Sequence, residues 1–265
     1  MSTTTPVTPI DIRLMNVVSA LLLLMLGALL LVAGLNWAMQ QPVFAIRGVS
    51  VTGDVAHYNA ITLRANVMPR LQGTFFTLDV KAARKVFETM PWVRRAIVRR
   101  EFPNRLKVQL QEHQAVAYWG TEIDNRLVNS FGEVFEANVG ELEQEQLPRL
   151  NAPDGQSALV LAHYQRLKPL FDAKDLALVQ LELSPRGAWR AQLDSGAELE
   201  LGGGNTEELL ARTQRFLSTI TQVTAGYKRL PNQLASVDLR HTDGYAIRLE
   251  GVSTLEEVDK RNTRR

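Results

Sequence analysis

The chain has 265 residues, with 30 Lys and Arg against 28 Asp and Glu, and it has no Cys. The absence of cysteine excludes a disulfide framework, a thiol nucleophile and a thiolate metal site. The formal net charge of +2 is a small difference between two large numbers, so it gives no support for nucleic-acid binding.

An uncharged apolar segment lies close to the N-terminus. No charged side chain occurs between Arg13 and Arg47, and within residues 17–35 only Ser19 has a polar side chain. At about 1.5 Å per residue, a helix of this length covers roughly 28 Å, close to the ~30 Å hydrocarbon core of a bilayer. Trp37 follows at the depth where an amphipathic ring prefers the lipid headgroups. The pattern therefore predicts a membrane anchor.

Three interpretations of this segment compete. A buried core helix would carry a polar stripe, which is absent here. A cleaved signal peptide needs a shorter apolar stretch and a small-x-small cleavage site, for which Val32-Ala33-Gly34 is a weak candidate. We therefore expect a retained single-pass anchor over residues 14–38. Arg13 at its boundary favours a short cytoplasmic tail over residues 1–13 and an extracytoplasmic body.

Residues 43–113 show the pattern of a small α+β domain. Alternating apolar residues predict strands at both ends, helical spacing predicts two helices between them, and Asp79 is placed to cap the second helix. The expected elements are a strand over residues 44–51, helices over residues 61–71 and 80–87, and strands over residues 92–100 and 106–111 joined by the turn 102–104. The order is β-α-α-β-β.

Residues 114–252 are expected to form a β-rich domain with two helices. The expected elements are a hairpin over residues 127–135, helices over residues 157–171 and 207–223, strands over residues 176–183, 189–193 and 197–201, and a closing hairpin over residues 236–249. Asn205 and Glu208 predict a capping box at the second helix. The glycines before it lack the Lys and Ser or Thr of a phosphate loop. Residues 253–265 have many charges and few apolar residues, which predicts a disordered tail.

The titratable residues show no catalytic pattern. The four histidines are far apart in the sequence, and none has the HExxH or HxH spacing of a metal site. No GxSxG or SxxK motif supports a serine nucleophile. The sequence therefore predicts that the protein is not an enzyme and has no catalytic, cofactor or metal site.

Several motifs together resemble a known family. The segment that resembles the end of a POTRA domain reads Pro91-Trp92-Val93, then Ala96-x-Val98-x-Arg100, then Phe102-Pro103-x-x-Leu106-x-Val108-x-Leu110-x-Glu112. A short tail, one anchor, a single such unit, the hairpin 128–135 and the late run 237–240 together resemble the FtsQ/DivIB family of bacterial cell-division proteins. The similarity covers nearly the whole chain.

The resemblance implies a fold and a function. The fold would be α+β, with a single N-terminal transmembrane helix, a POTRA domain over residues 43–113, and a β domain over residues 114–252 that ends in an edge hairpin. The function would be that of a divisome scaffold in the cell inner membrane, with a periplasmic body that recruits the FtsB–FtsL complex to the septum and contacts FtsK through the POTRA domain. The alternative is a POTRA-bearing envelope component for protein transport or assembly, although such proteins usually carry repeated POTRA units or a membrane barrel.

The last hairpin is the expected partner-binding site. Its final strand has no later strand to cover it, and an uncovered edge must be either blunted or used. Tyr245 offers an aromatic ring of the kind that anchors interfaces, and the family resemblance places FtsB here. Proline at Ala246 is expected to remove a backbone donor from this edge. The predicted partner-binding residues are Arg186, Leu239, Arg240, His241, Asp243, Gly244, Tyr245 and Ala246.

A second expected surface lies on the POTRA-like unit. Six basic residues occur within residues 94–107, where Ala96 and Val98 can face the core while Arg95, Ile97 and Arg99 face solvent. This basic face is either merely solvated or a patch for a protein or anionic lipid, and nucleic acid is disfavoured outside the cytoplasm. The predicted recruitment residues are Val98, Arg99 and Arg100.

Overall fold

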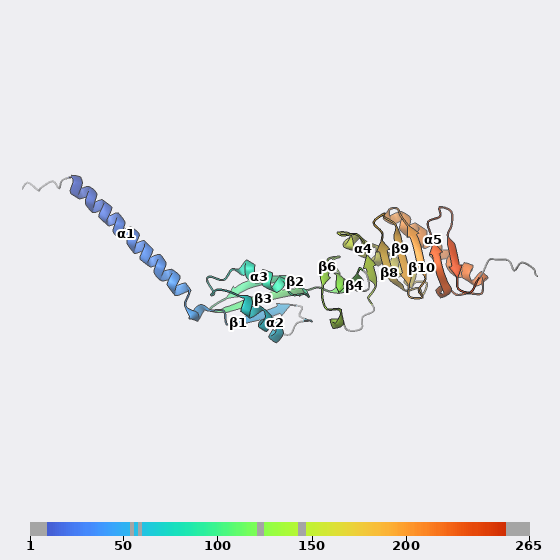
Figure 1. The fold of residues 1–265 in the computed structure, drawn as a ribbon, viewed down its shortest axis with the longest axis horizontal. Coiled ribbons are helices and arrows are strands. Elements are labelled where there is room, and N and C mark those ends of the chain that lie inside the picture. The colour runs from blue at the N-terminus through green and yellow to red at the C-terminus, as the bar shows by residue number, and fades with distance from the viewer. Residues whose placement is uncertain (1–9, 54–55, 58–59, 121–124, 143–146, 253–265) are drawn as a thin grey trace, which may run out of the picture. The chain divides into compact units, whose positions relative to one another are not determined.

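The computed structural model describes residues 10–53, 56–57, 60–120, 125–142 and 147–252. The expected disordered tail over residues 253–265 and most of the expected cytoplasmic tail lie outside these ranges. The chain divides into two compact units, Met1–Glu112 and His113–Arg265 (Figure 1). Each unit has its own hydrophobic core.

The N-terminal helix α1 spans Ile10–Met39. Within it, Leu14–Met39 is long and apolar enough to cross a membrane, and none of the tested segment is buried against other parts of the protein. This exposure contradicts the interpretation as a core helix, because such a helix would bury its apolar side chains.

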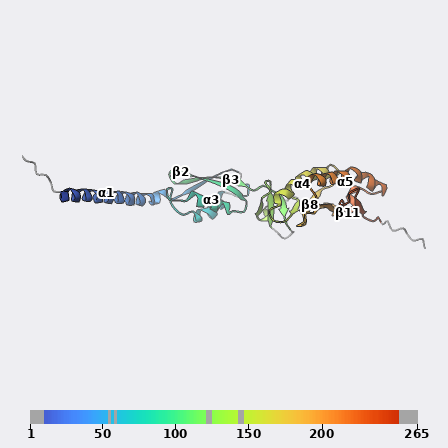
Figure 2. The same cartoon turned by 90° about the horizontal axis from the view of Figure 1, so that it is seen from above.

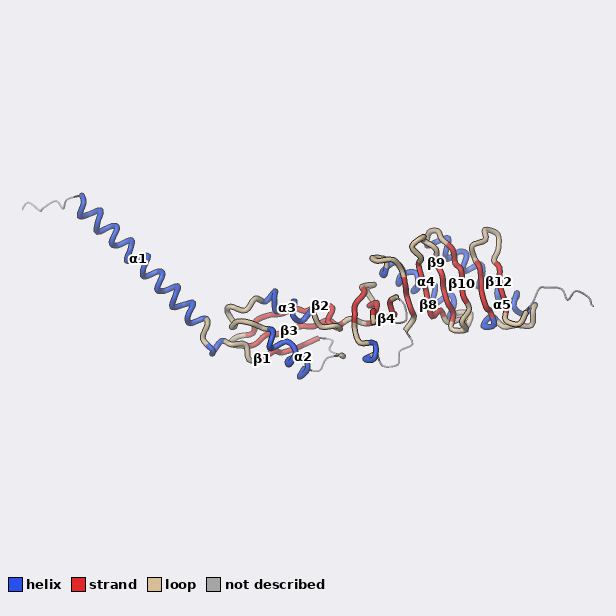
Figure 3. Tube along the Cα trace, viewed as in Figure 1, coloured by secondary structure: helices blue, strands red, loops and turns tan. Residues whose placement is uncertain are grey.

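We call residues 42–112, the expected POTRA domain, the POTRA unit. It packs two helices on one face of a three-stranded sheet (Figure 3). The sheet order is β1-β3-β2, with β1 parallel and β2 antiparallel to β3. Its elements are β1 (Gly48–Gly53), α2 (Ala60–Val67), α3 (Val80–Glu88), β2 (Val93–Glu101) and β3 (Arg105–Glu112). The predicted β-α-α-β-β order is confirmed.

Local features of this unit follow from its side chains. The Asp79 carboxylate accepts the amide proton of Lys81 at 2.8 Å, which confirms the predicted cap of α3. Ala96 and Val98 face the core while Arg95 and Arg99 are exposed, as the alternation predicted.

The predicted start of the first strand is wrong. Pro42–Phe44 forms a 3-10 turn and β1 begins only at Gly48, because its partner strand β3 begins at Arg105, opposite Gly48. Between them Ala45 makes an isolated bridge to Thr74.

The second unit is built on one nine-stranded sheet in the order β12-β11-β10-β9-β8-β7-β4-β5-β6. Its strands are β4 (Ala115–Trp119), β5 (Arg126–Asn129), β6 (Val134–Glu136), β7 (Arg149–Asn151), β8 (Leu178–Leu183), β9 (Trp189–Leu193), β10 (Glu198–Gly202), β11 (Leu234–Asp238) and β12 (Ala246–Leu249). The helices α4 (Ser157–Asp172) and α5 (Thr206–Gly226) lie along one side of it (Figure 2). Phe171 of α4 and Phe216 of α5 are fully buried in the shared core.

The sequence predicted most of this unit. Both helices and the final hairpin are confirmed, and Asn205 and Glu208 form the predicted capping box. The strands β4 and β7 were not predicted. The three residues of β7 are too few to show an alternating pattern, and it joins the sheet only by pairing in parallel with β4 and β8.

Candidate functional site: the β12 edge

The strand β12 is an outer strand of the large sheet. It pairs antiparallel with β11 through Val237 opposite Ile247 and Asp238 opposite Ala246. Among the described residues no strand lies beyond it. Its outer edge therefore offers unpaired backbone groups to another chain.

One backbone hydrogen bond shows which amides of β12 face outwards. The amide of Glu250 donates to the carbonyl of Gln233 at 3.0 Å, so Glu250 faces β11. Successive residues of a strand direct their backbone groups to opposite sides. By this alternation, the backbone groups of Arg248 and Ala246 also face β11, and the amide of Ile247 faces away from the sheet.

A hydrogen bond at the end of β11 leads independently to the same orientation of the β12 amides. The amide of Leu239 donates to the Glu200 carbonyl of β10 at 2.9 Å, so Asp238 faces β12 and bonds with its partner Ala246. Ala246 is therefore the wrong site for a proline that is meant to remove an outer donor. Ile247 is the correct one.

The start of β12 is tied to helix α5. The hydroxyl of Tyr245 shares a hydrogen bond of 2.6 Å with Thr219, and its ring packs edge-on against Phe216 with 5.2 Å between ring centroids. Arg215 of the same helix donates to the carbonyl of Thr242 at 3.0 Å. Tyr245 is consequently half-buried and holds the edge in place.

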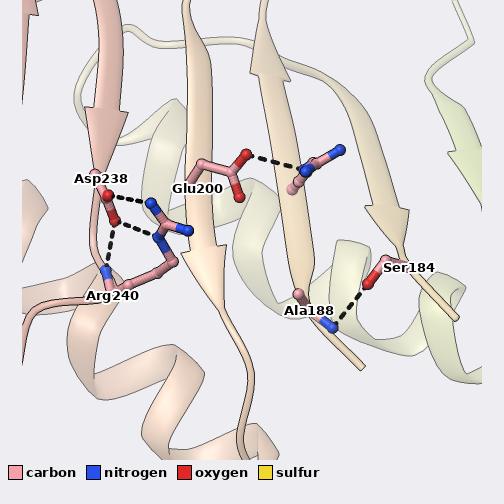
Figure 4. A network of polar contacts seen from close by, with 6 residues as sticks. Ser184, Ala188, Glu200, Asp238 and Arg240 are labelled. Carbon is pink, nitrogen blue, oxygen red and sulfur yellow. Dashed lines mark hydrogen bonds and ion pairs between the residues drawn. The ribbon is translucent and has the colours of Figure 1, made fainter. Parts of the chain in front are cut away.

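Arg186 lies at the tip of the β8–β9 hairpin. Proline at the second position and glycine at the fourth position of Ser184-Pro185-Arg186-Gly187 favour a tight turn. The amide of Gly187 closes the turn by donating to the Ser184 carbonyl at 2.9 Å, and the Ser184 hydroxyl accepts the amide proton of Ala188 at 3.0 Å (Figure 4). Gly187 has a φ of 78°, which favours glycine. The turn presents Arg186 to solvent.

Arg240 is paired within its own segment. Its guanidinium donates to both carboxylate oxygens of Asp238, at 2.9 and 2.6 Å, and its amide donates to one of them at 2.9 Å (Figure 4). These hydrogen bonds lower the pKa of Asp238 to about 2 and raise the pKa of Arg240. The next charged pair along the sheet joins Arg190 and Glu200 at 2.9 Å.

Arg186 and Arg240 lie at the same end of the sheet, on either side of the glycine loop Gly202-Gly203-Gly204. A Cβ atom at Gly202 would lie 3.1 Å from the side-chain stem of Arg240, and one at Gly203 would lie 3.3 Å from the carbonyl of Gly187. The loop therefore lies between the turn that carries Arg186 and the end of β11. Together with the β12 edge, these two arginines form what we call the edge site.

The predicted partner-binding residues differ in their exposure to solvent. Arg186, Arg240, His241, Asp243 and Ala246 are exposed, and Gly244 and Tyr245 are half-buried. Leu239 is only 2% exposed and belongs to the core, so it supports the site from beneath. Sequence reasoning missed Asp238 and Thr219. Asp238 carried a signal, since a carboxylate two residues before an arginine can bond it, whereas nothing in the sequence links Thr219 to Tyr245.

The predicted recruitment residues of the POTRA unit have three different environments. Val98 is buried in the core. The guanidinium of Arg100 donates to the carbonyl of Leu78 at 2.6 Å, so this side chain holds the segment before α3. Arg99 is exposed and lies opposite Lys107 in the β2–β3 ladder, where two like charges face solvent.

Two histidines make ring and polar contacts among the described residues. No group of three or more His, Cys, Asp or Glu side chains among them could hold a metal ion. His57 bonds Glu112 at 3.0 Å and stacks on Trp92. His163 lies within 3.0 Å of the Thr206 hydroxyl and stacks on Trp189.

Comparison with known proteins identifies both units. Residues 44–113 match the family described as POTRA domain, FtsQ-type, and residues 117–240 match the family described as Cell division protein FtsQ/DivIB, C-terminal. The chain is 39% identical to the cell division protein FtsQ of Burkholderia pseudomallei over 251 residues, covering 94% of this chain and 98% of that protein.

Other relatives agree. The cell division protein FtsQ of Thiomonas arsenitoxydans is 39% identical over 92% of this chain and 89% of its own length. That of Bordetella pertussis is 34% identical over 90% of this chain and 92% of its own length. With both units and nearly the whole length matched, this chain belongs to the FtsQ/DivIB family of bacterial cell-division proteins.

Proposed function

We propose that this cell-division protein is a non-enzymatic scaffold that holds the FtsB–FtsL complex at the septum. In this proposal α1 anchors it in the inner membrane, its N-terminal tail is cytoplasmic, and both folded units lie in the periplasm. The observation that carries the proposal is the edge site, where the outer edge of β12 is uncovered among the described strands and the exposed Arg186 and Arg240 lie at the end of the sheet where β12 begins.

Strand addition is the binding mode that suits this edge. A partner strand laid along β12 would take up its outer backbone groups, which supplies affinity without requiring a deep pocket. The bonds from Tyr245 to α5 fix the start of β12 before the partner arrives. A fixed edge loses little conformational entropy on binding.

Charge would set the position of the partner. Arg186 is exposed on its turn, while the charge of Arg240 is largely balanced by Asp238. For an acidic segment of FtsB that continues beyond the added strand across this end of the sheet, the charge of Arg186 is more available than that of Arg240. Such contacts set orientation and association rate more than affinity.

Two variants of one residue test strand addition. Ile247→Pro removes an outer amide and leaves the bonds of Ala246 and Arg248 to β11 intact, since proline is tolerated on edge strands when its missing donor faces solvent. Ile247→Ala removes the same side chain but keeps the amide. Binding of the periplasmic segment of FtsB to the full-length chain in detergent is measured for both, with thermal unfolding as the check on folding.

The proposal predicts that Ile247→Ala retains FtsB binding and that folded Ile247→Pro loses it. Equal binding by the two folded variants would overturn strand addition. Loss of binding in both would assign the contact to the side chain of Ile247 instead.

The POTRA unit is proposed to contact FtsK or another division protein. The outer edge of β2 and the exposed Arg99 support this proposal. Because Arg100 has a structural bond, the test is septal localisation of Arg99→Glu alone, at normal abundance. Unchanged localisation would rule out this face.

The transport alternative has weaker support. The relatives compared above are all named as cell-division proteins. A fluorescent fusion separates the two hypotheses, because a scaffold of division gives a band at midcell and a transport component gives a uniform envelope signal.

A further inference from the structure

Four phenylalanines form a partly exposed cluster at one end of the POTRA unit. Phe76 packs edge-on against Phe44 and Phe75, with centroids 4.9 and 5.2 Å apart, and Phe75 packs against Phe102 at 5.7 Å. Phe76 is 44% exposed and Phe102 is 72% exposed. We call Phe44, Phe75, Phe76 and Phe102 the aromatic tip.

Three separate segments bring these rings together. The amide of Phe75 donates to the Phe44 carbonyl at 2.7 Å, and the amide of Arg47 donates to the Asn104 carbonyl in the β2–β3 turn at 2.9 Å. The chain thus enters the POTRA unit at the tip. Hydrogen bonding holds this end together, and large apolar rings are nevertheless left in contact with solvent.

The tip is close to the membrane anchor along the chain. Phe44 comes five positions after Met39, the last residue of α1, and five chain steps span at most about 17 Å. The 3-10 turn Pro42–Phe44 shortens this reach further, because such a turn rises only about 2 Å per residue. The hydroxyl of Thr74, next to Phe75, donates to the carbonyl of Met39 at 2.8 Å.

Basic residues flank the rings. Arg47 and Arg105 are exposed and line a shallow pocket of about 270 Å³ together with Gly48, Ser50 and Asn104. Exposed phenylalanine rings bury at the boundary between lipid headgroups and acyl chains, and neighbouring arginines are attracted to anionic headgroups.

We propose that the aromatic tip is a membrane-contact surface that inserts Phe76 and Phe102 into the headgroup layer of the bilayer that holds α1. Arg47 and Arg105 then face the lipid phosphates. The occupant is the bilayer itself, because the anchor keeps the tip within reach of it at all times. This contact limits the directions in which the POTRA unit can point away from the membrane.

The absence of cysteine from the chain allows a direct test. Single cysteines are introduced as Phe76→Cys and Phe102→Cys in the full-length chain and labelled with a polarity-sensitive fluorophore. Pro91→Cys is the control, an exposed position two residues before β2, at the opposite end of that strand from Phe102. The proteins are placed in vesicles of phosphatidylethanolamine and phosphatidylglycerol that carry nitroxide-labelled lipid headgroups.

The proposal predicts blue-shifted emission and strong quenching by the labelled lipid at positions 76 and 102, with quenching by aqueous iodide at position 91. Equal iodide quenching at all three positions would overturn it, even if the tip proved to bind a protein in cells. The charge contribution is tested with Arg105→Glu against Lys107→Glu on the same strand. Only Arg105→Glu should reduce lipid quenching at position 102. Equal effects of the two variants would show that Arg105 makes no specific contact with the lipid phosphates.

Discussion

Arg186 and Arg240 differ in how much of their charge is available to a partner. Arg240 is held by two bonds to Asp238, whereas Arg186 extends from a tight turn into solvent. We therefore expect Arg186→Glu to weaken FtsB binding about tenfold, equivalent to ~1.4 kcal/mol. Titration calorimetry measures this, with Arg166→Glu on α4 as the control of equal charge change. Equal weakening by both variants would show a general charge effect only.

The pair of Asp238 and Arg240 has a defined pH dependence. The pKa of Asp238 is lowered to about 2 from an ordinary value of 3.8, chiefly by hydrogen bonding to Arg240. Its stabilising contribution is therefore present above about pH 4 and is lost as the pH falls towards 2. The contribution is small because solvent screens a surface pair.

A carboxyl NMR titration measures this pKa directly. Arg240→Ala should return the pKa of Asp238 towards its ordinary value. An unchanged low pKa in that variant would show that another group holds the carboxylate.

At the scale of single elements, strand β2 of the POTRA unit separates a structural arginine from a surface one. Arg100→Ala removes a charged donor from the Leu78 carbonyl and should lower the free energy of unfolding by about 1–3 kcal/mol. Arg99→Ala should change it by less than about 0.5 kcal/mol, because that side chain is exposed. Urea denaturation of the two variants checks the difference, and equal stability loss would contradict it.

Sequence patterns predicted those helices and strands whose own residues show a clear apolar periodicity. The long helices α4 and α5 and the hairpin of β2 and β3 show clear periodicity. The strand β7 does not, because it is defined only by neighbours that are distant in sequence.

In the candidate site, too, some features could be predicted from local sequence and others depend on residues distant in the chain. Its position at β12 could be predicted, because the hairpin that contains β12 has a clear alternating pattern and β12 is the last strand that the described residues form. The alternation of its amides could not be predicted, because it depends on the pairing of Glu250 with Gln233. The half-burial of Tyr245 depends on Thr219 in a distant helix.

At the scale of the whole molecule, we expect α1 to act mainly as a tether for FtsB binding. Its one pair of small residues at the spacing of a helix-dimer seam is Gly34 with Ala38, at its C-terminal end, which is too little for a continuous tight interface. Replacing residues 17–35 with an unrelated apolar helix should leave FtsB binding intact in a pull-down. Loss of binding by an abundant, folded exchange variant would contradict this expectation.

Amide hydrogen exchange is the most direct test of the proposed addition of an FtsB strand to β12. In the free protein the amides of Ala246 and Arg248 should be protected by β11, while that of Ile247 should exchange fast. On adding the FtsB segment, NMR should show new protection at Ile247, with Ala246 and Arg248 protected throughout. Binding that leaves the exchange of Ile247 unchanged would rule out strand addition at β12.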